Sequence, residues 1–116
     1  MYTFKSRAAA DILMLEDTAK HILQLLDKTP GEPGILTVEQ IPGALEVLEK
    51  AVQEDDARRK ALEEAMRSAD AERVAKAGQE SAELGAVSLR QRVAPLAEML
   101  RTSLAEKKDV TWHPKG

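Results

Sequence analysis

The chain has 116 residues, of which 43% are hydrophobic and 32% charged, and its formal net charge at pH 7 is −3. This length and composition are typical of one globular domain, so we expect residues 1–116 to form a single domain. The sequence contains no cysteine and only three aromatic residues, which excludes disulfides and thiol chemistry and predicts an aliphatic core.

Neither a membrane nor a nucleic acid is expected as a partner. No apolar run approaches the ~20 residues that a membrane span needs. Asp11 interrupts the apolar stretch that follows Lys5 and Arg7, so we expect no signal peptide and a cytoplasmic location. Residues 88–116 carry six basic and three acidic groups, but this mildly basic tail on an acidic chain is not typical of nucleic-acid binding.

The amino terminus predicts a β-hairpin. Residues 2–5 alternate apolar and polar side chains, which is typical of a strand with one buried face. Residues 12–15 form a continuous apolar run, which favours a strand buried on both faces. Residues 6–10 would then be the connection.

A short amphipathic helix should follow, with Asp17 or Thr18 as its N-cap and its end near Lys28. Its apolar face consists of Ala19, Ile22, Leu25 and Leu26. Residues 29–34 read Thr-Pro-Gly-Glu-Pro-Gly, a composition that predicts a double turn.

The middle of the chain predicts a long helix. Thr37 and Gln40 have the spacing of a capping box, and Pro42 follows within the first turns, where its missing N–H costs little. The apolar stripe of this helix is Ile41, Leu45, Leu48 and Val52. We expect this first half to pack against the rest of the protein.

The second half of the long helix is highly charged and should be largely solvated. Three acids lie four residues ahead of three bases, and the pairs are Glu54–Arg58, Asp55–Arg59 and Asp56–Lys60. An alternative is that this half is an arm that presents Leu62, Met66 and Ala69 to a partner. Residues 70–86 contain few large apolar side chains and should be a fraying helix end followed by a flexible connection.

The last helix carries the clearest local signals. Ser88 and Gln91 form a second capping-box pattern at its start. Its apolar stripe is Leu89, Val93, Leu96, Leu100 and Leu104. Pro95 lies on the opposite side, where a kink would bend the helix around the core. Residues 110–112 form a short last strand that needs the amino-terminal hairpin as its partner.

These elements predict an α+β fold. A small antiparallel three-stranded sheet, made of the amino-terminal hairpin and the short last strand, should be covered by three helices, of which the middle one is long.

Four segments carry a resemblance to a known family: residues 4–15, 34–42, 87–100 and 110–112. They resemble a family of small, uncharacterised bacterial proteins, domain of unknown function family 1840. The resemblance implies a bacterial source and domain limits close to those of this chain. It implies no activity, ligand or functional residue.

No residue pattern predicts a catalytic, cofactor or metal site. Asp17 and His21 share a helix face, but a metal site needs three or four converging ligands, so a solvated polar face is the favoured interpretation. Weak ligand-binding candidates are Ser88 and Arg90 at the start of the last helix and Trp112 in the last strand. For each of them a structural role is favoured: a helix cap, a local ion pair and a core anchor.

The sequence therefore leaves the biochemical function unknown. The favoured hypothesis is a non-enzymatic structural or interaction protein that forms a homo-oligomer through the sheet or the long helix, because short sheets leave edges that invite pairing. The alternative is a small-molecule or anion-binding domain near Ser88 and Arg90. An enzyme would require a cleft that gathers carboxylates, and no cofactor is expected.

Overall fold

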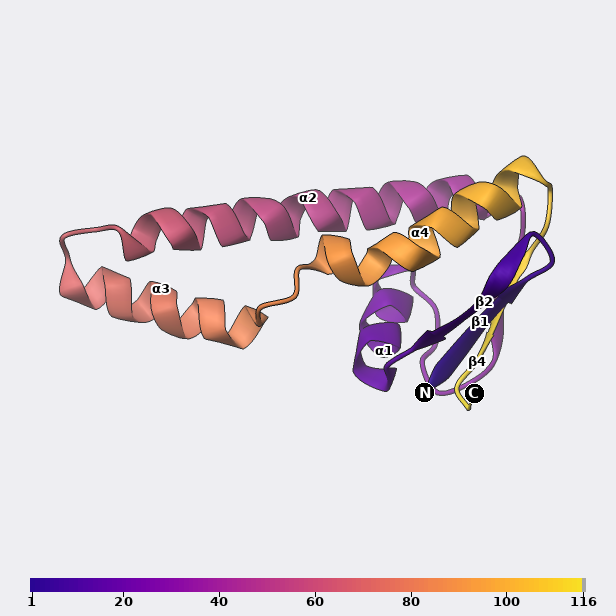
Figure 1. The fold of residues 1–116 in the computed structure, drawn as a ribbon, viewed down its shortest axis with the longest axis horizontal. Helices are drawn as coiled ribbons and strands as arrows, with labels where there is room; N and C mark the ends of the chain where they lie inside the picture. The colour runs from indigo at the N-terminus through magenta and orange to yellow at the C-terminus, as the bar shows by residue number, and fades with distance from the viewer. Residues whose placement is uncertain (116) are drawn as a thin grey trace.

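The computed structural model describes residues 1–115, which form a four-stranded antiparallel sheet and four α-helices. The molecule is elongated, with principal extents of 53 × 27 × 22 Å. The sheet lies at one end, and a hairpin of two helices projects from the other end (Figure 1). The α+β class predicted from the sequence is confirmed.

The sheet contains the three predicted strands and one more. Strands β1 (Tyr2–Ser6) and β2 (Ala9–Met14) form the amino-terminal hairpin, and β4 (Val110–His113) pairs with β1 as predicted. The additional strand, β3 (Gly34–Leu36), pairs with β4, so the order is β2-β1-β4-β3. The prediction of three strands was wrong because β3 has only three residues and directly follows the predicted double turn.

One face of the sheet packs against the helices and the other is open. The buried side chains of the inner face are Tyr2, Phe4, Met14, Leu36, Val110 and Trp112. The prediction that residues 12–15 are buried on both faces was wrong. Leu13 is 65% exposed and Leu15 is 64% exposed, whereas Met14 between them is buried.

Helix α1 (Glu16–Leu25) begins slightly earlier than predicted. Leu15 occupies the N-cap position, and Asp17 lies in the first turn instead of capping it. The long helix α2 (Ile41–Met66) follows a single turn in which the Oε1 of Gln40 accepts the N–H of Thr37 at 3.0 Å. That contact is half of the predicted capping box.

A fourth helix, α3 (Ala71–Leu84), occupies most of the segment 70–86, where the sequence predicts a fraying end and a flexible connection. It lies antiparallel to the second half of α2 and forms the projecting arm with it (Figure 1). This half of α2 is therefore covered on one side, and Leu62 is only 6% exposed. The contact side of α3 is made of small residues such as Ala77 and Gly78, so no large apolar stripe marks it in the sequence.

Helix α4 (Leu89–Ala105) matches its prediction closely. Both halves of the Ser88–Gln91 capping box are present, and Pro95 lies on the exposed side. The stripe residues Leu89, Val93, Leu96 and Leu100 are all buried. The helix contacts α2 on one side and strands β1 and β2 on the other. It therefore forms the middle layer of the body, between the sheet and the long helix.

Candidate functional site

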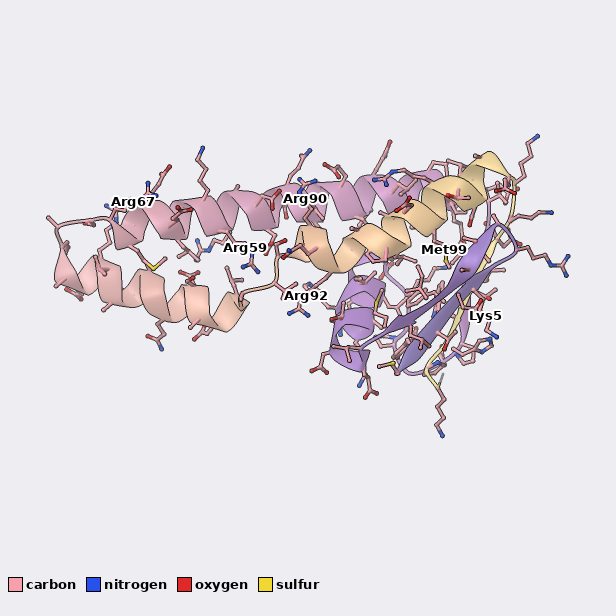
Figure 2. The ribbon with its side chains drawn as sticks, in the orientation of Figure 1. Lys5, Arg59, Arg67, Arg90, Arg92 and Met99 are labelled. Carbon is pink, nitrogen blue, oxygen red and sulfur yellow. The ribbon has the colours of Figure 1, made fainter. Side chains whose placement is uncertain are left out.

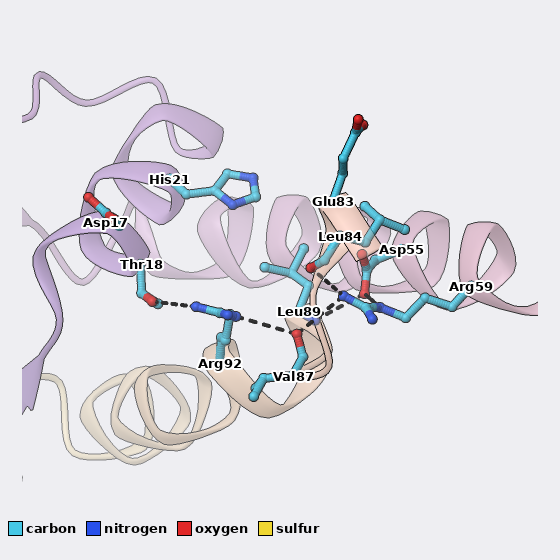
Figure 3. Close-up of a pocket in the computed structure, with 10 residues that line it drawn as sticks. All are labelled: Asp17, Thr18, His21, Asp55, Arg59, Glu83, Leu84, Val87, Leu89 and Arg92. Carbon is cyan, nitrogen blue, oxygen red and sulfur yellow. Dashed lines mark hydrogen bonds and ion pairs between the residues drawn. The ribbon is translucent and has the colours of Figure 1, made fainter. Parts of the chain in front are cut away.

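A hollow of about 310 Å³ lies where the arm joins the body. It is lined by α1, the middle of α2, the end of α3 and the start of α4 (Figure 3). We call it the joint hollow. Its charged and polar lining includes Asp17 and His21 from α1, Asp55 and Arg59 from α2, and Arg92 from α4.

Arg59 ties the long helix to the connection between α3 and α4. Its terminal nitrogens donate to three backbone carbonyl oxygens: Gly85 at 2.7 Å, Leu84 at 3.2 Å and Val87 at 3.2 Å. Carbonyls at the end of a helix have no partner within that helix, so a guanidinium is well suited to satisfy them. Arg59 thus holds the connection in place and has little hydrogen-bonding capacity left for a ligand.

Asp55 completes this network from the previous turn of α2. Its Oδ2 accepts from the Nε of Arg59 at 2.8 Å and from the N–H of Leu89, the first residue of α4, at 3.0 Å. Partial burial acts to raise the pKa of Asp55, but the Leu89 hydrogen bond and the Arg59 charge outweigh it, and the pKa is lowered. The Asp55–Arg59 pair was predicted from its i,i+4 spacing, and it is present.

The other two predicted helix pairs are replaced by contacts between helices. Arg58 forms its ion pair with Glu80 of α3, and Asp56 forms its ion pair with Arg90 of α4. Both replacements connect α2 to an element that follows it in the chain. The sequence could not show this, because a surface charge pairs with whichever helix packs beside it.

Arg92 closes the joint hollow towards α1. Its Nη1 donates to the Oγ1 of Thr18 at 2.9 Å, and its Nε donates to the Val87 carbonyl oxygen at 3.4 Å (Figure 3). Most polar groups of the hollow are thus engaged in holding elements together. We interpret the joint hollow as the structural attachment of the arm.

Asp17 and His21, which share a face of α1, lie on the rim of the joint hollow, where both residues are exposed. Within residues 1–115, no three His, Cys, Asp or Glu side chains lie close enough together to hold a metal ion. The geometry of the described chain thus offers no third ligand beside this pair.

The three sequence-based ligand candidates do not form one site. Ser88 accepts from the N–H of Gln91 as a helix cap, and Arg90 donates to Asp56 at 2.7 and 3.0 Å on the surface of the molecule (Figure 2). Trp112 lies in the core with 1% of its surface exposed. A ligand near the start of α4 would therefore have to displace contacts that already stabilise the fold.

A second hollow, of about 590 Å³, lies on the open face of the sheet, at the end remote from the arm. Its basic lining residues are Lys5, Arg7, Lys107 and Lys108. We call it the basic hollow. No local sequence pattern predicts this hollow, because Lys5 and Arg7 lie near the amino terminus whereas Lys107 and Lys108 lie near the carboxyl terminus.

The open face also exposes apolar side chains near one sheet edge. Leu13 of β2 and Leu15 just after it are the most exposed large hydrophobic residues of the chain described here. β2 is an edge strand of the sheet, because β1 pairs with it on one side only. The exposed leucines and the unpaired edge together make β2 and the residue after it the most accessible apolar part of the sheet.

Comparisons with known proteins assign the chain to a family. None of the helices in residues 1–115 combines the length and the hydropathy that crossing a membrane requires. No curated protein and no solved structure matches the chain. The family model of a domain of unknown function, DUF1840, matches residues 1–112, which confirms the resemblance inferred from the sequence. The chain therefore belongs to the DUF1840 family.

Proposed function

We propose that this is a non-enzymatic cytoplasmic protein that self-associates, and that two copies join through the free edge of β2. The observation that carries the proposal is a six-residue edge strand in which Leu13 is 65% exposed. An edge strand presents unpaired backbone N–H and C=O groups, which pair readily with a second strand. The absence of cysteine fits a reducing compartment.

The two edges of the sheet differ in how well they could accept a partner. β3 has three residues and follows Pro33, which has no N–H to donate. β2 has six residues without proline, glycine or lysine, and Asp11 is its only charged residue. Natural edge strands are normally blocked by short length, proline or charge, so β2 is the edge that remains open to pairing.

The side chains of β2 also favour one register for a symmetric pair. A two-fold axis at Asp11 would place two carboxylates directly opposite each other, which is unfavourable. An axis at Leu13 pairs residues 12–14 of the two copies and places the two Leu13 side chains side by side on the open face. It also places Ile12 opposite Met14 of the partner subunit on the inner face. This register covers exposed apolar surface and keeps the Asp11 side chains apart.

Light scattering on a size-exclusion peak tests the proposal. At tens of micromolar, the wild type should have the mass of a dimer, and Leu13→Lys should have the mass of a monomer. The matched control is Val47→Lys, because Val47 is 42% exposed but lies on α2, and this variant should stay dimeric. A monomeric wild type at that concentration would overturn the proposal.

Cross-linking tests the interface itself. Because the chain has no cysteine, Leu13→Cys introduces a single thiol. Residues directly opposite in an antiparallel pair have Cβ atoms about 5 Å apart, close to disulfide geometry. Mild oxidation should give a covalent dimer of Leu13→Cys much faster than of Val47→Cys. Equal rates in a dimeric sample would place the interface away from β2.

A further inference from the structure

We infer that the basic hollow on the open face of the sheet binds a small phosphate-bearing anion. The basic side chains of the hollow come from two segments that are distant in sequence: the end of β1 with the turn that follows it, and the loop between α4 and β4. The first contributes Lys5 and Arg7, and the second contributes Lys107 and Lys108. Lys5 lies at the sheet end of the molecule, opposite the arm tip where Arg67 lies (Figure 2).

Strand pairing brings these two segments together. β1 and β4 are antiparallel neighbours in which Lys5 lies opposite Thr111 and Ser6 lies opposite Val110. The turn that follows β1 and the loop that precedes β4 therefore meet at the same end of the sheet. A volume of about 590 Å³ is within the usual range for small-molecule sites.

The charge of the hollow is opposite to that of the chain. Its lining contains four basic and two acidic side chains, whereas the whole protein has a net charge of −3. Asp109 is engaged, because its Oδ1 accepts the N–H of Val38 at 2.9 Å. Within residues 1–115, the one ion pair made by these four cations joins Lys5 to Asp11 at 3.9 Å. The positive charges of Arg7, Lys107 and Lys108 are therefore available to a ligand.

The helix dipole explains only part of this cluster. Lys107 and Lys108 follow the carboxyl end of α4, where cations are favoured on any helix. Lys5 and Arg7 belong to the hairpin, so the same reason does not apply to them. Placing four cations around one hollow costs electrostatic repulsion, which a bound anion would relieve.

The types of side chain favour phosphate. A guanidinium offers two parallel N–H donors that match phosphate oxygens, and lysine ammonium groups add charge from other directions. Thr111 also lines the hollow, and Ile35 provides an apolar surface for the rest of an organic phosphate. Pairing through the edge of β2 leaves this face open, so the site does not depend on the proposed dimer.

Calorimetric titration with inorganic pyrophosphate at fixed ionic strength tests the inference. We expect saturable binding with a Kd below about 1 mM, which is the range of weak specific sites. The double variant Arg7→Gln/Lys108→Gln should weaken binding at least tenfold. The control Lys76→Gln removes one exposed cation from the arm and should bind as the wild type does. All substituted residues are exposed, and circular dichroism verifies that the variants fold.

Two further titrations distinguish the source of the anion. Citrate carries carboxylates instead of phosphates, and vesicles of phosphatidylcholine and phosphatidylglycerol present phosphate at a lipid surface. Pyrophosphate binding that is lost in the double variant and is stronger than citrate binding supports the inference. It is overturned if pyrophosphate does not bind, if citrate binds equally well, if only the vesicles bind, or if Lys76→Gln weakens binding as much.

Discussion

The indole ring of Trp112 occupies the space that a side chain on Gly34 would need. The two residues are partners across β3 and β4, and a Cβ built on Gly34 would lie 2.6 Å from Cε2 and 2.9 Å from Nε1 of the indole. The ring is therefore buried against bare backbone, with 1% of Trp112 exposed. Glycine in a strand often marks such a close approach.

Gly34→Ala should destabilise the protein, because the indole or strand β3 must move to make room for the new methyl group. Overpacking of this kind costs about 1–3 kcal/mol. Urea unfolding followed by the fluorescence of the single tryptophan measures the loss. Gly43→Ala in α2 is the control: apart from the neighbouring residues and the backbone of α2 itself, no atom lies within 4 Å of the point that a Cβ there would occupy. Alanine also favours helix, so stability should be unchanged or increased. Equal stability of the two variants would contradict the packing described.

Arg59→Ala should weaken the attachment of the arm to the body. The substitution removes the guanidinium that donates to the Asp55 carboxylate and to three backbone carbonyls, and such losses typically cost about 1–3 kcal/mol. Arg58→Ala on the same helix is the control, because its pair with Glu80 is half-exposed and contributes at most about 1 kcal/mol. Hydrogen exchange of the amides in 84–89 should accelerate in Arg59→Ala alone. Unchanged exchange there would show that Arg59 does not hold the connection.

The pH dependence of stability should reflect Asp55. Its pKa in the folded protein is lower than its ordinary value of 3.8, so its contribution to the free energy of unfolding is complete above that value. The contribution is lost as pH falls through the folded pKa. Asp55→Asn should therefore be less stable than wild type at neutral pH, and the difference should shrink below about pH 4. Urea unfolding from neutral to acidic pH measures it, with exposed Glu54→Gln as control. A difference that persists at low pH would contradict this prediction.

Ser88→Ala should lower stability by about 1 kcal/mol through loss of the helix cap. The Ser88 Oγ accepts the N–H of Gln91 at 3.2 Å, and the Gln91 Oε1 accepts the N–H of Ser88 at 3.1 Å. Ser88→Asp keeps an acceptor at the same place and should retain most of the stability. Thermal unfolding of the three proteins measures the effect. If the aspartate and alanine variants lose the same amount, the cap is not the cause.

Elements with a strong local signal were predicted well. The stripe of α4, its capping box and Pro95 identified a buried helix, and the alternation of Tyr2 to Lys5 identified β1. β3 and α3 were missed because both depend on a neighbour. β3 is a strand because β4 lies beside it, and α3 packs small residues against Leu62 instead of presenting a large apolar stripe.

The candidate site residues depend on the tertiary structure more than the elements do. Ser88, Arg90 and Trp112 were singled out individually, yet the fold gives each of them a structural role. The two hollows combine residues from distant segments, such as Arg7 with Lys108. A single sequence contains no signal for such combinations.

For helices and strands with a clear apolar pattern, the sequence by itself determined which side is buried, because the spacing of apolar residues indicates the buried side of one element at a time. Only the tertiary structure decided which partners these elements meet. Asp56 pairs with Arg90 of another helix instead of its own Lys60, and β2 is left at an open edge. Interactions of this kind depend on the path of the chain through space, and that path is set by the packing of all elements together.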